Sequence, residues 1–109
     1  MAHSFAKIYL HVVFSTKHRE PIISDSVRED LHKYVAATLT SMKCPPVLIN
    51  SVEDHIHLLF ELSRTKTVSS VLEKVKVGSS KWIKTQGAEL TQFAWQGGYG
   101  AFAVSAGEA

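Results

Sequence analysis

The chain has one cysteine, three prolines and no long hydrophobic run, and these shortages exclude several classes of protein. Cys44 cannot form a disulfide within the chain, which favours a reducing compartment, and we expect an ordinary thiol in a loop or at the core edge. No apolar run approaches the ~18 residues of a membrane-spanning helix, and the N-terminus lacks the apolar region of a signal peptide. The sequence therefore predicts a cytoplasmic protein with no membrane partner.

The chain also lacks a large excess of positive or negative residues, and its formal net charge is only +2. Its sign would suit a polyanion, although the distribution of charge matters more than the total. The 109 residues and their 45% hydrophobic content predict a single globular domain over 1–109. Six histidines are many for this length, and two of them stand close together in the sequence.

Those two histidines belong to DHIHLLFEL, residues 54–62, which alternates like a half-buried strand. Its apolar face would be core, whereas His55, His57 and Glu61 would share the other face. Imidazoles at i and i+2 on a strand project the same way and can converge on one metal ion. A third ligand would have to come from another residue, with Asp54, Glu61, His11 or a residue later in the chain as candidates. The common alternative is a pair of surface polar residues.

Alternation and turn residues predict the remaining strands, and helical spacing predicts two helices. Ser26 and Glu29 have the spacing of a capping box and would open the first helix, with Tyr34 on its buried stripe. The second helix is expected over 68–85, with Trp82 facing inward. The predicted strands are 7–15, 47–52, 55–62, 93–95 and 100–105.

This order is βαββαβ with one extra short strand, and it predicts the α+β class. Short connections and right-handed crossovers favour the ferredoxin-like arrangement, which RNA-recognition modules share. It has an antiparallel sheet with two helices packed on one face. The first and third strands are neighbours in its centre, so His11 would join His55 and His57 on the open face.

Four blocks of the sequence are similar to one known family. They are YLHVVFSTKHREPII at 9–23, DHIHLLF at 54–60, KVKVGSSKWI at 74–83 and FAWQGGYGAFAVS at 93–105. In this order they resemble the TnpA-type single-tyrosine HUH transposases of small bacterial insertion sequences and their REP-associated relatives. The resemblance runs nearly end to end. It implies a homodimer that cuts and rejoins single-stranded DNA near hairpins through a 5′-phosphotyrosine intermediate.

In that resemblance, His55 and His57 correspond to the ligands of a divalent metal, Mg²⁺ or Mn²⁺. The family's nucleophile lies in a Y-x-x-x-Q pattern after the block at 93–105, and its glutamine completes the metal site. No Y-x-x-x-Q occurs in these 109 residues, and we expect the chain to be truncated before that helix. Tyr9, Tyr34 and Tyr99 are the tyrosines that remain, and none matches the pattern.

Basic residues predict contacts with DNA phosphates. Lys17, His18 and Arg19 follow the first strand, while Lys74 and Lys81 lie seven apart on one side of the second helix. Three functions stay open: a transposase-like DNA enzyme, a non-catalytic DNA-binding remnant or regulator, and an RNA-binding module. The last would need aromatic side chains on the central strands for base stacking, and Tyr9 alone is placed there.

Overall fold

The computed structural model describes residues 7–104 of the chain. Within this range, no helix is long and apolar enough to cross a membrane. In chain order the elements are β1 (Ile8–Ser15), η1 (Lys17–Arg19), α1 (Asp25–Ser41), β2 (Pro46–Ser51), β3 (His55–Leu62), α2 (Val68–Ile83), η2 (Ala88–Leu90) and β4 (Gly100–Val104), where η1 and η2 are short 3-10 helices.

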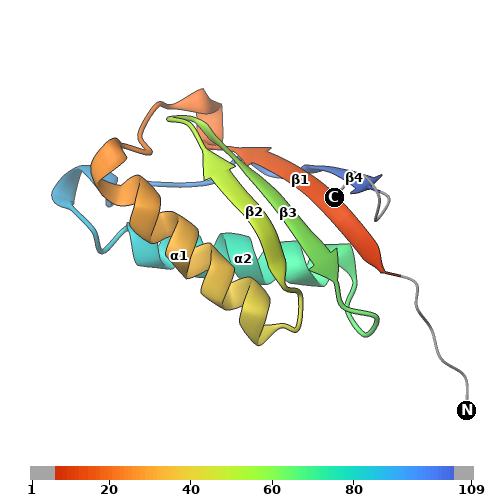
Figure 1. The fold of residues 1–109 in the computed structure, drawn as a ribbon. Helices are drawn as coiled ribbons and strands as arrows, with labels where there is room; N and C mark the ends of the chain where they lie inside the picture. Colours follow the sequence, from red (N-terminus) through yellow and green to blue (C-terminus); the bar gives the residue numbers. More distant parts are fainter. Residues whose placement is uncertain (1–6, 105–109) are drawn as a thin grey trace, which may run out of the picture.

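The four strands form one antiparallel sheet in the order β2-β3-β1-β4. Helices α1 and α2 lie together on one face of this sheet (Figure 1). The predicted α+β class and ferredoxin-like arrangement are therefore confirmed, with β1 and β3 adjacent in the centre. In the register of this pair Val13 lies opposite His57, and Ser15 lies opposite His55.

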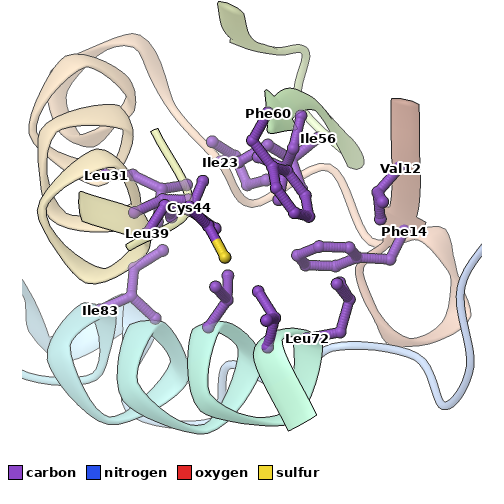
Figure 2. Close-up of a cluster of buried hydrophobic side chains, with 14 of the residues drawn as sticks. Val12, Phe14, Ile23, Leu31, Leu39, Cys44, Ile56, Phe60, Leu72 and Ile83 are labelled. Atoms are coloured by element: carbon purple, nitrogen blue, oxygen red, sulfur yellow. The ribbon is translucent and has the colours of Figure 1, made fainter. Parts of the chain in front are cut away.

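The core fills the space between the sheet and the two helices (Figure 2). Alternation along β1 and β3 sends every second side chain toward the helices, which leaves the other sheet face open to solvent. Fully burying one large apolar side chain contributes roughly 1.5–3 kcal/mol. The core includes Val12 and Phe14 from β1, Ile56, Leu58 and Phe60 from β3, Leu31 and Leu39 from α1, and Leu72 and Ile83 from α2.

Cys44 is more deeply placed than the sequence suggested. Cys44 lies in the loop between α1 and β2, as expected, but its side chain is fully buried among the core residues and not at the core edge (Figure 2). Its sulfur accepts a hydrogen bond from the Ser63 amide at 3.4 Å. The thiol therefore serves as a small apolar core residue.

Helix α1 begins two residues earlier than the predicted capping box requires. Ser24 is the N-cap, and its side chain bonds the Ser26 hydroxyl at 2.9 Å instead of capping a backbone N–H. Asp25 opens the first turn and forms an ion pair with Arg28 at 3.0 Å. The capping-box prediction is wrong because Ser26 lies inside the first turn.

Helix α2 ends at Ile83, and Ile83 occupies the buried position that Trp82 was expected to fill. Trp82 is half-buried and stacks on the similarly half-buried Tyr34 of α1, with ring centroids 5.5 Å apart. A Cβ on Gly78 would lie 3.0 Å from the Tyr34 hydroxyl. A glycine at this position therefore allows the aromatic ring of α1 to approach α2 closely.

The segment 93–95 is not a strand of the sheet. Trp95 forms only an isolated bridge with Thr16, directly after β1. The chain then bends through two glycines before β4 begins at Gly100, and Gly98 adopts a positive φ of 83°. Ser105, the last residue of the predicted final strand, lies outside the described range.

Candidate metal and nucleic-acid site

His55 and His57 lie on β3, on the sheet face that the helices leave open. Both side chains are half-buried, because they alternate with the core residues of the same strand. Their rings meet edge to face, with centroids 4.9 Å apart. The expected pairing of two imidazoles on one open face is therefore present.

Each of these histidines has its Nδ1 occupied by a neighbour. His55 Nδ1 lies 2.8 Å from a carboxylate oxygen of Asp54, which also pairs with Arg19 at 3.7 Å. His57 Nδ1 lies 3.1 Å from Nε2 of His11. Among residues 7–104, no side chain is hydrogen-bonded to Nε2 of either His55 or His57. Both histidines thus retain a free Nε2 as a prospective ligand atom.

Burial and nearby charges influence the protonation of the groups around this histidine pair. The hydrogen bond from His55 lowers the pKa of Asp54, assisted by the nearby charges of His55 and Arg19. Burial lowers the pKa of His57, and the neighbouring His55 and His11 lower it further. Asp54 is therefore an ionised acceptor, and His57 favours the neutral form that can bind a metal.

None of the expected third ligands joins the pair. Asp54 is engaged at His55 Nδ1 and His11 at His57 Nδ1, while Glu61 lies near the far end of β3, opposite Tyr9. In the described part of the chain, no group of three or more His, Cys, Asp or Glu side chains could hold a metal ion. The residues present therefore fit two positions of a coordination sphere and leave the others to different groups.

A cleft of about 490 Å³ opens beside the two histidines. Its walls are His55 and His57, the end of β1 at 13–15, Arg19 of η1 and the loop formed by residues 96–100. This 96–100 loop includes Tyr99, the one tyrosine among Tyr9, Tyr34 and Tyr99 that lines the cleft. The cleft thus combines imidazoles, a guanidinium and a glycine-rich backbone.

Helix α2 holds the 96–100 loop through one side chain. The ammonium of Lys76 donates to the carbonyl oxygens of Gln96 at 2.7 Å and Gly98 at 2.9 Å. It also lies 5.3 Å from the centre of the Phe14 ring, a cation–π contact. Partial burial lowers the pKa of Lys76. On its other side the loop is tied to β1, because the Gln96 amide donates to the Ser15 carbonyl at 2.8 Å.

Trp95 secures the start of the loop against the core. Its indole N–H donates to the Ser79 hydroxyl of α2 at 3.0 Å. Its ring meets Phe14 and Phe93 edge to face, with centroids 4.7 and 4.8 Å away. The sequence predicted a short strand at 93–95, and the contacts of Lys76 and Ser79 with this segment were missed. These contacts depend on how α2 packs against the segment. In the sequence, only the family resemblance of the block at 93–105 indicated that this segment matters.

The basic residues that follow β1 lie beside the cleft. Lys17, His18 and Arg19 form η1 and are exposed, and His18 and Arg19 have positive φ angles of 59° and 56°. This conformation is stabilised by the 93–100 segment, since the His18 amide donates to the Gln96 side chain at 3.3 Å. Arg19 alone of the three lines the cleft.

The other two predicted DNA contacts are elsewhere. Lys74 and Lys81 are exposed on α2 and line a groove that includes Gly78. Helix α2 packs on the sheet face opposite the histidines (Figure 1), and neither lysine lines the cleft. The predicted basic residues therefore form two surfaces, one at η1 and one on α2.

With this geometry in place, comparison with known proteins defines the class. Residues 4–109 match the profile of a family described as "Transposase IS200 like". The chain therefore belongs to the IS200-like transposase family, which confirms the resemblance seen in the sequence and gives it a transposase-like function. No match is found among curated proteins.

Solved structures that share the fold include two transposases. A candidate transposase from Deinococcus radiodurans R1 is 20% identical, with a TM-score of 0.88, and the alignment covers 97% of this chain and 85% of that one. A REP-associated tyrosine transposase bound to a REP hairpin is 12% identical, with a TM-score of 0.68. Here the alignment covers 95% of this chain and 61% of that one, so the chain spans less than two thirds of that protein.

Proposed function

We propose that this chain binds hairpin-bearing single-stranded DNA and positions one phosphate of it at His55 and His57 for strand cleavage and rejoining. The observation that carries the proposal is the pair of imidazoles with free Nε2 atoms on two residues that line one cleft together with Arg19. Family membership and the hairpin bound by the REP-associated relative support DNA as the partner. They also favour DNA over the RNA alternative.

Each group in the cleft has a definite task in this proposal. His55 and His57 hold a divalent cation, Mg²⁺ or Mn²⁺, together with oxygen ligands from water or phosphate. The cation supplies Lewis-acid polarisation of a phosphate oxygen. Arg19 and Lys17 neutralise the DNA backbone at the mouth of the cleft. The 96–100 loop closes the opposite wall and excludes part of the solvent.

The proposed reaction is a transesterification. A tyrosine hydroxyl oxygen forms a bond to phosphorus, the bond from phosphorus to the 3′ oxygen breaks, and that oxygen leaves with a proton as a 3′-hydroxyl. The 5′-phosphotyrosine conserves the bond for rejoining. A second candidate function is DNA binding without cleavage, which needs only the exposed basic residues of η1 and the cleft beside them.

A covalent-capture experiment separates these two functions. Labelled hairpin DNA is mixed with the chain and Mn²⁺, with and without chelator, and resolved on denaturing and native gels. A metal-dependent band shifted by one protein mass supports cleavage, and peptide mapping then identifies the tyrosine. A native-gel complex without a covalent band supports binding alone. Absence of both would refute the proposed function.

The two ligand histidines are tested separately by calorimetry. His55→Ala or His57→Ala is expected to abolish Mn²⁺ binding, because one imidazole cannot replace two. His32→Gln is the matched control, since His32 lies on α1 and bonds Ser51 away from the cleft. Unchanged Mn²⁺ binding in both alanine variants would rule out this metal site.

The two basic surfaces are distinguished by salt dependence. Each phosphate contact to a single strand contributes a slope of about 0.7 in log K against log salt. The double variant Lys17→Ala with Arg19→Ala is therefore expected to reduce the slope by about 1.4. The double variant Lys74→Ala with Lys81→Ala is expected to reduce it by the same amount. The control is Lys33→Ala, whose ammonium already pairs with a glutamate of its own helix. If a double variant leaves the slope unchanged, the two basic residues that it removes make no phosphate contact.

We also propose a homodimer, as the resemblance implies. β4 is an edge strand of the sheet, and Phe102 on it is 63% exposed. A second copy could cover this edge by strand pairing. Phe102→Lys is expected to give monomers in sedimentation equilibrium, and an unchanged mass would exclude this edge as the interface.

A further inference from the structure

We propose that His11 is a positioning residue that accepts the Nδ1–H of His57 and so fixes the tautomer in which His57 Nε2 is free to bind a cation. This inference rests on the metal site of the proposed function. In the sequence analysis His11 was a candidate third metal ligand, whereas here it acts on His57 and does not contact the metal. Three observations support it: the hydrogen bond, the placement of His57 between two hollows, and the matching arrangement at His55.

The sheet register creates the contact between the two side chains. Val13 is opposite His57 in the antiparallel pair of β1 and β3, so His11 is the diagonal neighbour on the same face. The His11 Nε2 and His57 Nδ1 atoms are 3.1 Å apart, and the rings are nearly stacked, with centroids 5.3 Å apart and planes inclined by 29°. Both strands are central in the sheet, which fixes this separation.

His57 lies between the cleft and a second, smaller pocket of about 230 Å³. His57 lines both spaces, whereas His11 lines only the second pocket, with Leu48, Leu59 and Val104. Nδ1 of His57 is bonded to His11, so the edge of the ring that carries Nε2 is the one left for the cleft. His11 therefore supports His57 from behind and does not belong to the wall that meets a ligand.

The hydrogen bond between two neutral imidazoles can form in two ways. If His57 donates from Nδ1, its Nε2 keeps a lone pair; if His11 donates, His57 carries its proton on Nε2 and cannot bind a cation there. At His55 the direction of the hydrogen bond is fixed, because the ionised Asp54 can only accept and His55 Nδ1 must donate. Histidine ligands in proteins usually donate their other N–H in this way. His11 completes the same arrangement for His57.

The experiment compares His11→Phe, His11→Gln and Tyr9→Phe with the unmodified chain. Phenylalanine keeps a ring but has no acceptor, while the glutamine amide oxygen can accept from His57. Tyr9→Phe is the matched control on the same strand and face. The imidazole ¹⁵N shifts of His57 report its tautomer without metal, and calorimetry reports Mn²⁺ affinity.

We expect His57 to carry its proton on Nδ1 in the unmodified chain, in His11→Gln and in Tyr9→Phe, and on Nε2 in His11→Phe. Loss of such a partner typically weakens metal binding by about 10- to 100-fold, and we expect that loss in His11→Phe, with recovery in His11→Gln. An Nε2–H tautomer in the unmodified chain, or full Mn²⁺ affinity in His11→Phe, would overturn the inference.

Failure of the proposed function would look different. If the unmodified chain binds no Mn²⁺, the metal site itself is refuted, while the ¹⁵N shifts of the metal-free protein still decide whether His11 sets the tautomer of His57. If His11→Phe does not fold, the inference is decided by the tautomer of the unmodified chain and by His11→Gln. A merely structural histidine would leave the ¹⁵N pattern of His57 unchanged.

Discussion

Substituting Lys76 by methionine tests whether the 96–100 loop is held in place from α2. Methionine keeps most of the apolar stem but removes the ammonium that binds two loop carbonyls. Hydrogen bonds to charged groups contribute about 1.5–3 kcal/mol each when buried. Because Lys76 is half-exposed, we take about 2 kcal/mol for both bonds together. Since 1.4 kcal/mol is a factor of ten, the loop should open about 30-fold more often.

The assay is hydrogen exchange of the Gln96 and His18 amides, measured by NMR, because the first donates to the Ser15 carbonyl at 2.8 Å and the second to the Gln96 side chain at 3.3 Å. In Lys76→Met these amides are expected to exchange about 30-fold faster, while those of the central strands keep their rates. Lys74→Met is the control, because Lys74 is exposed on the same helix and lines the distant groove. Unchanged loop exchange would refute the reasoning. Equal acceleration of every amide would also refute it, because it would indicate a global effect.

Three further substitutions test other parts of the structure. Ser79→Ala removes the acceptor of the Trp95 indole and should lower the free energy of unfolding by about 1 kcal/mol in urea titration; no change would mean that solvent replaces the bond. Gly78→Val places bulk against the Tyr34 hydroxyl and should lower the melting temperature, at a cost of roughly 1–3 kcal/mol; a stabilised variant would contradict the close approach. Burial and a nearby arginine lower the pKa of His32, so the unfolded chain binds its proton first as pH falls. Stability should therefore drop below about pH 6.5, and this part of the drop should vanish in His32→Gln; an identical pH profile in both would exclude His32 as the cause.

Periodicity and connection rules were sufficient to predict the sheet and the histidine pair. Alternation is a local property, so it correctly placed His55 and His57 on one face of β3. The rule that places the first and third strands side by side also placed His11 on that face, although its contact with Nδ1 of His57 could not be foreseen. A contact of 3.1 Å depends on rotamers, which the sequence pattern does not specify.

The errors came from features that depend on packing between elements. Trp82 and Ile83 both fit a helical stripe, and contact with the ring of Tyr34 decides which one is buried. Trp95 has strong strand propensity, but Ser79 and the aromatic rings beside it hold it outside the sheet. Nothing in the sequence pattern distinguishes Lys76 from the other lysines of α2, because its bonds to the loop carbonyls depend on how the two segments pack.

If His55 and His57 bind a cation as proposed, their position in the middle of the sheet has a thermal consequence. β3 has hydrogen-bonded neighbours on both sides, so its amides are expected to open only when the whole domain unfolds. The spacing between the two imidazoles is therefore expected to be kept until the domain unfolds. On heating, cation binding should be lost together with the cooperative unfolding transition, whereas the 96–100 loop should loosen at lower temperature. Between those two temperatures the proposed cation site would remain intact, while the loop would no longer confine a nucleotide beside it.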